Sequence, residues 1–240
     1  MQDILTAISQ QNEIDAIRTL VIAGAKMSGA TCYSYHLTPR FQRQNSANVQ
    51  MCSEGYPETW TDIYSDPAFR ESDPMPDFVV GYGAPMTWSD AIAQIRAKPD
   101  TPPGTERFFE AMKDHGLVHG IGIPLYGPNC RDGYAAFCFD EEVDVNGEKV
   151  ETLVRMMNTA HRRIVELLDD CEQANIGLSE REHEVLERIA EGCSNAEIAL
   201  RLGISPETVG TYVKRLYEKL DTHDRIGATV KGLKLGLIYA

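Results

Sequence analysis

The sequence predicts two domains of different fold class, an α+β domain over residues 1–170 and an all-α domain over residues 178–240. Two patterns predict them: residues 178–240 contain three helix-start signals in close succession, and residues 1–170 mix short β-rich runs with helical periodicity. Between them, residues 171–177 are polar and end in Gly177, which is typical of a linker.

In the larger domain the apolar spacing predicts helices at both ends of the segment and strands between them. Such an order favours a central antiparallel sheet between helical layers, an α/β/α sandwich. The expected helices are 4–27, 103–113 and 147–170, and the expected strands are 31–37, 48–54, 120–126 and 134–140.

The smaller domain begins with two capping boxes, in which a Ser side chain caps a helix and a Glu three residues later returns the bond. The pairs are Ser179 with Glu182 and Ser194 with Glu197. Gly203 then provides the positive φ of a tight turn, and Ser205 with Pro206 begins a third helix. This spacing predicts a helix-turn-helix.

The third helix has an apolar stripe and a polar outer face. Its apolar residues recur at steps of four, three and four, as expected for the side that packs on a core: Val209, Val213, Leu216 and Leu220. The outer face carries Thr208, Thr211, Lys214, Arg215 and Glu218. Hydroxyl and cationic groups are suited to base edges and phosphates, which predicts a recognition helix for DNA. The alternative is a solvated face of a small bundle.

These residues resemble the C-terminal domain of LuxR-type transcription regulators. The resemblance covers about sixty residues and rests on Glu182, Leu186, Gly192, Ser194 to Ala199, Leu202, Ile204, Ser205, Thr208, Val209, Lys219 and Leu220. It implies double-stranded DNA as a partner and contacts from Thr208, Thr211, Lys214, Arg215 and Lys219. The family usually has Lys and His where this chain has Gly210 and Tyr212, so a different preferred DNA site is expected.

Composition restricts the class of protein. The chain has 240 residues, of which 42% are hydrophobic, and it shows neither a long apolar run nor a secretory leader, so we expect a cytoplasmic protein without membrane association. We therefore expect the six cysteines to be reduced, as small buried residues. Their spacing does not fit a zinc site.

Charge is unevenly divided between the two domains. Residues 176–240 hold nine Lys and Arg against ten Asp and Glu, a net charge of −1. Because the whole chain carries −13, residues 1–175 carry −12 and are repelled by nucleic acid. Tight DNA binding is therefore expected to depend on base contacts and on a homodimer.

An aromatic cluster in the larger domain suggests a small-molecule site. Tyr64 lies one helical turn after Trp60, and Asp73 precedes a proline within ten residues. An indole donates hydrogen bonds, a phenol donates and accepts them, and an ionised carboxylate only accepts. Such a set suits a ligand with carbonyls and an amide N–H. From residue types alone, a plain core corner is the competing interpretation.

The same region resembles the autoinducer-binding domain of LuxR-type receptors, through Trp60, Tyr64, Asp73, Pro74, Trp88, Gly116, Leu117, Gly120, Pro124 and Gly133. The resemblance implies an N-acyl-homoserine lactone as ligand. Trp60 would donate to the lactone carbonyl, Asp73 would accept from the amide N–H, and Tyr56 would donate to the amide carbonyl. Tyr64 and Trp88 would line the site. A homodimer on an inverted-repeat DNA site is expected.

Two positions depart from the family's better-known pattern. Ala136 stands where a Ser or Thr is common, so a hydroxyl is expected to be missing, and Met75 offers an adaptable apolar surface. Little discrimination between 3-oxo and unsubstituted acyl chains is therefore expected. The candidates for the acyl pocket are Phe78, Val79, Val80, Ile123, Leu125 and Phe137, and strand alternation leaves open that half of them face the other side of the sheet.

The remaining interpretations are weaker. Apolar residues between Val150 and Leu168 predict a packing helix that a dimer could share, and Leu233, Leu235 and Leu237 suggest a second dimer contact.

The spacing of His115 and His119 is interrupted by glycines, and catalytic or cofactor-binding motifs are lacking. We therefore expect no enzymatic activity, no metal site and no cofactor. A phosphorylated response regulator would need an acidic cluster near the N-terminus. A regulator of the same fold with a non-lactone ligand, or none, is the main alternative.

Overall fold

The computed structural model describes residues 2–39, 49–102 and 104–238. The chain divides into two compact units, residues 1–165 and 166–240. The predicted strand at 48–54 and the predicted helix at 103–113 each begin at a residue that lies outside the described ranges.

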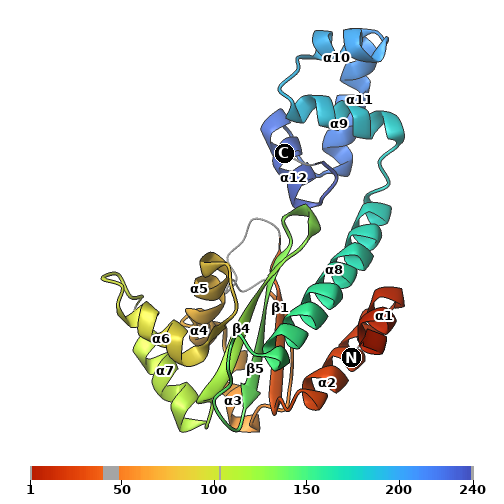
Figure 1. The fold of residues 1–240 in the computed structure, drawn as a ribbon. Helices are drawn as coiled ribbons and strands as arrows, with labels where there is room; N and C mark the ends of the chain where they lie inside the picture. Colours follow the sequence, from red (N-terminus) through yellow and green to blue (C-terminus); the bar gives the residue numbers. More distant parts are fainter. Residues whose placement is uncertain (1, 40–48, 103, 239–240) are drawn as a thin grey trace. The chain divides into compact units, whose positions relative to one another are not determined.

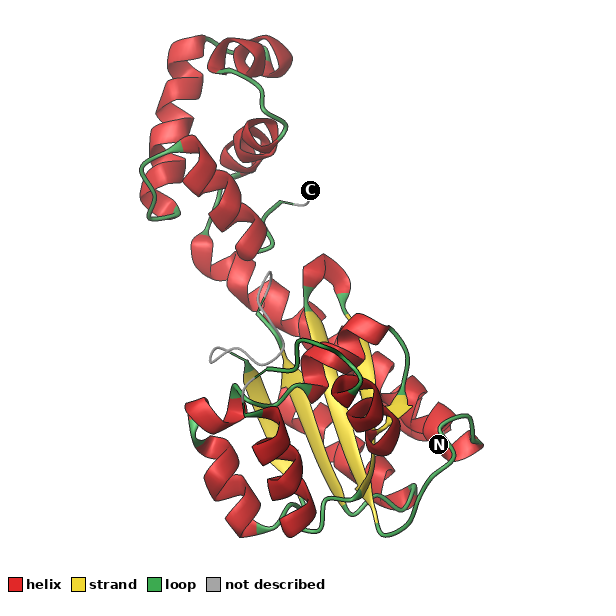
Figure 2. Cartoon of the chain, turned by 90° about the vertical axis from the view of Figure 1, so that its left-hand side faces the viewer, coloured by secondary structure: helices red, strands yellow, loops and turns green. Residues whose placement is uncertain are grey.

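The first unit is built on a five-stranded sheet in the order β2-β1-β5-β4-β3 (Figure 2). All of its strand pairs are antiparallel. Sequence patterns predicted four of the strands, and β3 was missed because two residues are too few to show an alternation. The strands are β1 (Cys32–Leu37), β2 (Gln50–Glu54), β3 (Met86–Thr87), β4 (His119–Tyr126) and β5 (Asp132–Phe139).

Helices cover both faces of this sheet (Figure 1), which confirms the predicted α/β/α sandwich. One face carries α1 (Gln2–Gln10), α2 (Ile14–Met27) and α8 (Glu148–Ile176). The other carries α3 (Glu58–Ser65), α4 (Pro67–Arg70), α5 (Met75–Tyr82), α6 (Trp88–Arg96) and α7 (Thr105–Asp114). A short 3-10 turn, η1 (Pro128–Cys130), joins β4 to β5.

The N-terminal segment forms two helices where one was predicted from Ile4 to Met27. The break includes Gln11 and Asn12, and Arg163 of α8 donates hydrogen bonds to both residues. The guanidinium donates to the Gln11 carbonyl oxygen at 2.7 Å and to Asn12 Oδ1 at 2.7 Å. Arg163 is more than 150 residues away in the sequence, so local periodicity cannot reveal its contact with this break.

Helix α8 is longer than predicted and continues to Ile176, through most of the segment expected to be a linker. Residues 148–176 contain neither Pro nor Gly, so this segment has no residue that stops the helix before Gly177. Its apolar side is buried within the first unit, including Val150, Leu153 and Ile164. The buried part of that stripe therefore packs in the core of its own domain.

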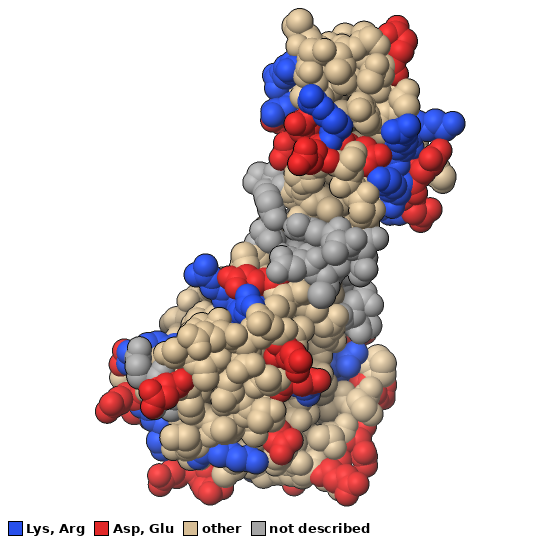
Figure 3. Space-filling view, turned by 90° about the vertical axis from the view of Figure 1, so that its right-hand side faces the viewer, with Lys and Arg blue, Asp and Glu red and all other residues tan. Residues whose placement is uncertain are grey.

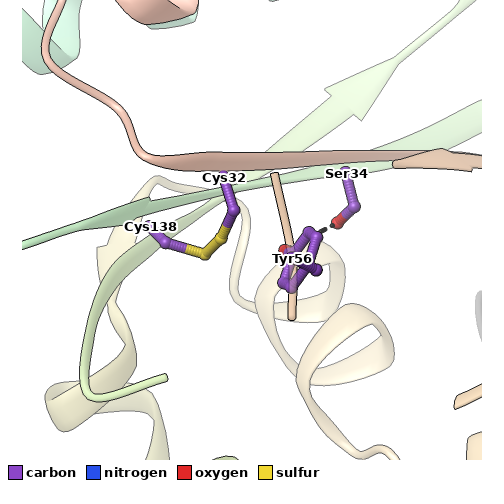
Figure 4. The surroundings of a disulfide bond; sticks show 4 residues. All are labelled: Cys32, Ser34, Tyr56 and Cys138. Carbon is purple, nitrogen blue, oxygen red and sulfur yellow. Dashed lines mark hydrogen bonds between the residues drawn. A yellow bond between two sulfur atoms is a disulfide. The ribbon is translucent and has the colours of Figure 1, made fainter. Parts of the chain in front are cut away.

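Cys32 and Cys138 form a disulfide, which corrects the expectation that all six thiols are reduced (Figure 4). The two residues are directly opposite each other on antiparallel strands β1 and β5, with Cα atoms 4.9 Å apart. This separation lies within the range that a disulfide spans. The two cysteines are 106 residues apart in the sequence, so local sequence patterns did not predict their pairing.

The second unit contains α9 (Glu180–Ala190), α10 (Asn195–Leu202), α11 (Pro206–Lys219) and α12 (Arg225–Lys234). Both predicted capping boxes are present, and Gly203 has φ +66° at the end of α10. Ser205 caps α11 through the N–H of Thr208. Val209, Leu216 and Leu220 are buried, and Val213 packs half-buried against the same core, which confirms the predicted register of the third helix.

Candidate ligand pocket and DNA-binding helix

The floor of the candidate pocket is one face of the β1 and β5 pair. Side chains alternate between the two faces of a strand, so every second residue of β1 points to the side covered by α3 to α7. These residues stand opposite partners on β5 in the same register: Cys32 with Cys138, Ser34 with Ala136, and His36 with Tyr134. This row of three residue pairs therefore has a disulfide at one end and two aromatic side chains, His36 and Tyr134, at the other.

Aromatic rings form the walls. Trp60 and Tyr64, one turn apart on α3, stack with ring centres 5.6 Å apart, so their predicted shared face is confirmed. Phe108 of α7 lies edge-on to Trp60 at 5.7 Å. Trp88 lies on the backbone of Gly120, where an added Cβ would come within 2.5 Å of the indole. Glycine is needed at this point of β4 because the ring occupies the space of a side chain.

Asp73 is the buried acid of the pocket, with 5% of its surface exposed. Tyr64 Oη donates to Asp73 Oδ2 at 2.7 Å, and the Met75 N–H donates to Asp73 Oδ1 at 2.9 Å. Burial raises the pKa of Asp73 to about 7, although these two hydrogen bonds partly oppose the rise. Each carboxylate oxygen has a second lone pair, so Asp73 can accept another donor.

Donors surround this carboxyl group. Tyr56 Oη donates to Ser34 Oγ at 3.3 Å (Figure 4). Burial raises the pKa of the Tyr134 phenol, nearby Asp73 and Tyr56 raise it further, and a bond from Trp88 opposes them. The phenols therefore remain protonated at neutral pH, and the protons of Tyr56 and Tyr64 are donated to Ser34 and Asp73.

The cavity so formed measures about 120 Å³. The structure brings all seven predicted ligand-binding residues together around it: Tyr56, Trp60, Tyr64, Asp73, Met75, Trp88 and Ala136. Its other lining residues are Ser34, His36, Met51, Ser53, Thr61, Ser65, Phe108, Met112, Leu117 and Tyr134. Aromatic residues and three methionines dominate the wall, and a few polar groups converge within it, as in small-molecule sites.

Position 136 offers no hydroxyl, but one enters the same cavity from the neighbouring strand. Ser34 lies directly opposite Ala136 and carries its hydroxyl into the same cavity from the neighbouring strand. None of the six residues suggested for the acyl pocket lines the cavity. Strand alternation places Ile123 and Phe137 on the opposite face from Ala136, and the register that decides this depends on pairing between distant segments.

The outer face of α11 is the candidate DNA contact. Lys214 and Arg215 are exposed, and neither has a hydrogen bond or an ion pair with any residue that the structure describes. Thr208 is half-buried beside the cap, and exposed Thr211 donates to the Glu207 carbonyl oxygen at 3.1 Å. The cations are thus available for phosphates or bases without breaking an internal contact.

Lys219 differs from the other four predicted DNA-binding residues. Its ammonium donates to the Gly177 carbonyl oxygen at 2.7 Å and to Glu182 Oε2 at 2.6 Å. Burial would raise the pKa of Glu182, but the bonds from Lys219 and Ser179 lower it overall. A phosphate contact by Lys219 would compete with these internal bonds.

Acidic and basic side chains are interspersed on the face of the second unit that Figure 3 shows. Several of its arginines have acidic partners, including Arg181 with Glu184 at 2.7 Å and Arg201 with Glu191 at 2.7 Å. Such pairing neutralises cations that would otherwise attract DNA. Lys214 and Arg215 therefore provide an unneutralised positive site on this domain.

Comparisons with known proteins agree with this division of the chain. The model of the autoinducer binding domain matches residues 14–164, and the model of the luxR family of bacterial regulatory proteins matches residues 177–231. RpaR of Rhodopseudomonas palustris, a quorum sensing-dependent transcriptional regulator, is 30% identical over 187 residues, covering 78% of this chain and 74% of RpaR.

The regulatory protein SdiA of Escherichia coli is 29% identical over 192 residues, covering 76% of this chain and 74% of SdiA. A crystal structure of SdiA matches the fold with a TM-score of 0.72 at 21% identity, covering 100% of this chain and 98% of the other. A second SdiA structure, in complex with octanoyl-rac-glycerol, gives the same TM-score at 22% identity, covering 100% and 95%.

An autoinducer-binding domain followed by a helix-turn-helix domain defines a ligand-responsive transcription regulator, which is not an enzyme. The chain belongs to the LuxR family of quorum-sensing regulators. Within the described residues, no helix is both long enough and apolar enough to cross a membrane.

Proposed function

We propose that this regulator binds an N-acyl-homoserine lactone in the first unit and an inverted-repeat DNA site, as a homodimer, through the second. The observation that carries the proposal is the buried Asp73 carboxyl group, which faces a cavity with aromatic walls and phenol, indole and hydroxyl donors. A lactone-amide ligand offers one amide N–H and several carbonyl oxygens, so it complements one acceptor among several donors. Its site of action would be the cytoplasm.

The amide N–H and the two carbonyl oxygens of the ligand each have a proposed partner. Asp73 accepts from the amide N–H, Trp60 donates to the lactone carbonyl, and Tyr56 donates to the amide carbonyl. To take the last role, the single O–H of Tyr56 would turn to the ligand from Ser34 Oγ, to which it donates at 3.3 Å. Tyr64 keeps Asp73 in place. Met75, Trp88 and Ala136 contact the apolar parts of the ligand.

Extraction of the purified protein, followed by mass spectrometry, tests the ligand class directly. A homoserine lactone with an acyl chain is expected in the extract from cells that make one. A non-lactone ligand is the second candidate, because SdiA, which has the same fold, has been crystallised with octanoyl-rac-glycerol. An acyl glycerol in the extract, with no response to added lactones, would favour that alternative.

The DNA-binding role follows from the second unit. Thr208, Thr211, Lys214 and Arg215 would contact bases and phosphates, with Lys219 near the backbone. One short helix covers too few base pairs for tight binding, and the −12 charge of residues 1–175 opposes nonspecific binding. Two recognition helices about 34 Å apart would meet two half-sites one DNA turn apart.

A dimer contact on α12 is expected from its exposed apolar residues. Ile226 is 76% exposed and Val230, one turn later, is 43% exposed. We expect Ile226→Glu to abolish dimeric DNA complexes in gel-shift titrations and to leave lactone affinity unchanged. Met27→Glu is the matched control, because Met27 is 69% exposed on α2 of the other unit. Equal dimer formation by both variants would contradict this contact.

Ligand affinity should depend on pH through Asp73. The ligand N–H and a proton compete for this carboxylate, so binding favours the ionised form, and affinity falls as the pH falls through about 7. Between pH 8 and pH 6 the ionised fraction falls about tenfold, and the dissociation constant should rise by a similar factor. Asp73→Asn should bind more weakly and show a flat profile. A tenfold change that persists in this variant would exclude Asp73 as its cause.

A further inference from the structure

Two buried histidines lie on opposite faces of the sheet, and their surroundings differ. His161 of α8 has partners for both ring nitrogens: Tyr35 Oη lies 2.7 Å from Nδ1, and the Arg131 carbonyl oxygen lies 3.0 Å from Nε2. A neutral imidazole has one donor and one acceptor, and both are satisfied here. His161 therefore has a structural role.

His36 lies on the pocket face, two residues after Ser34 on β1, and only 4% of its surface is exposed. Its ring is 5.5 Å from that of Tyr134 and 6.3 Å from that of Tyr64, measured between centres. Among the residues that the structure describes, no hydrogen-bond partner meets either ring nitrogen. The ring therefore packs against aromatic side chains at the wall of the cavity.

Leaving the donor and the acceptor of a buried imidazole unsatisfied is unfavourable, so a polar group is expected to occupy the cavity beside it. Burial, followed by the charge of nearby Arg70, lowers the pKa of His36 to about 4. At neutral pH the side chain is thus an uncharged group that can both donate and accept. It suits a hydroxyl or carbonyl oxygen and has no charge to attract a carboxylate.

In the proposed binding mode, the amide and the lactone carbonyl already have partners in Asp73, Tyr56 and Trp60. A polar group beside His36 then belongs to the acyl part of the ligand. Residues i and i+2 of a strand are about 6.6 Å apart, so His36 lies well beyond the contact between Ser34 and Tyr56. At this distance from the amide, His36 would contact a substituent on the acyl chain and not the amide itself.

We propose that His36 is a specificity-determining residue, which recognises an oxygen-bearing substituent, a hydroxyl or an oxo group, on the acyl chain of the ligand. The inference rests on the proposed function, since it assumes that the lactone-amide end occupies the Asp73 side of the cavity. It replaces the expectation, drawn from Ala136, that substituted and unsubstituted chains bind equally.

The full-length protein should be titrated with four lactones of equal chain length: N-hexanoyl, N-(3-oxohexanoyl), N-(3-hydroxyhexanoyl) and N-(6-hydroxyhexanoyl) homoserine lactone. Fluorescence of Trp60 and Trp88, both at the cavity, reports binding. We expect the wild type to bind at least one oxygenated probe tenfold or more tighter than the unsubstituted one. In His36→Phe this preference should disappear, because only the oxygenated probes lose a contact, and His36→Gln should retain part of it.

Two further variants serve as controls. Tyr35→Phe removes the hydroxyl that bonds His161 on the opposite face, so it should alter melting temperature without changing the order of the probes. Ser34→Ala tests the neighbouring hydroxyl. Loss of the preference in Ser34→Ala but not in His36→Phe would assign recognition to Ser34 and overturn the proposal.

The remaining outcomes separate this inference from the proposed function. Binding of none of the four lactones by the folded wild type would refute the lactone as ligand. If the wild type binds N-hexanoyl homoserine lactone but shows no preference, or if His36→Phe weakens all four equally, the lactone site stands. His36 then only packs in the wall or binds water, and the specificity proposal is rejected.

Discussion

Replacing Asp73 with alanine is expected to weaken N-acyl-homoserine lactone binding about tenfold to a hundredfold. The variant leaves the ligand amide N–H without its acceptor, and an unsatisfied buried hydrogen-bonding group costs about 1 to 3 kcal/mol. It also leaves the Tyr64 hydroxyl and the Met75 N–H without their acceptor, so part of the loss reflects a less ordered pocket. Titration with N-hexanoyl homoserine lactone measures the effect.

Trp60→Phe keeps an aromatic ring in the stack with Tyr64 but removes the indole N–H, so it should also reduce affinity about tenfold. Asp62→Ala is the matched control, because Asp62 lies on the same helix and is exposed. The second unit should stay folded in all of these full-length variants. Unchanged affinity in both Asp73→Ala and Trp60→Phe would exclude this cavity as the lactone site.

The double variant Lys214→Ala, Arg215→Ala is expected to lower affinity for an inverted-repeat operator by more than about a thousandfold. A homodimer loses four cations, each with a contribution of about 1 kcal/mol or more to phosphate or base contacts. Because neither side chain has an ion pair within the described residues, the folded domain should keep its stability. Gel-shift titration at several salt concentrations should also show a weaker salt dependence.

Arg181→Ala serves as the control for this pair, because Arg181 is a cation of the same domain whose guanidinium is bonded to Glu184. It should retain most operator binding. Lactone affinity should be the same in both variants, since α11 and α9 belong to the second unit. Operator binding by the double variant at wild-type affinity would show that another surface contacts DNA.

The features that sequence analysis predicted well depend on neighbours along the chain. Both capping boxes involve residues three apart, and the stack of Trp60 with Tyr64 involves residues four apart. Such contacts follow from helix geometry alone. The turn at Gly203 is equally local.

The features that it missed depend on strand register. Ser34 enters the pocket because it pairs with Ala136, and one residue of slip would turn it to the other face. His36 and Tyr134 share this dependence, and so do Cys32 and Cys138. Periodicity located these strands but could not show which side chains would lie across from one another.

The bond network of Lys219 has a mechanical consequence. Glu182 closes the cap at the start of α9 and also accepts from Lys219 at the end of α11, and the same ammonium holds the carbonyl of Gly177. The residue through which the chain enters the domain is thus tied to the helix that carries Lys214 and Arg215. Torque applied to the chain at Gly177 would act on the orientation of α11 without passing through the apolar core.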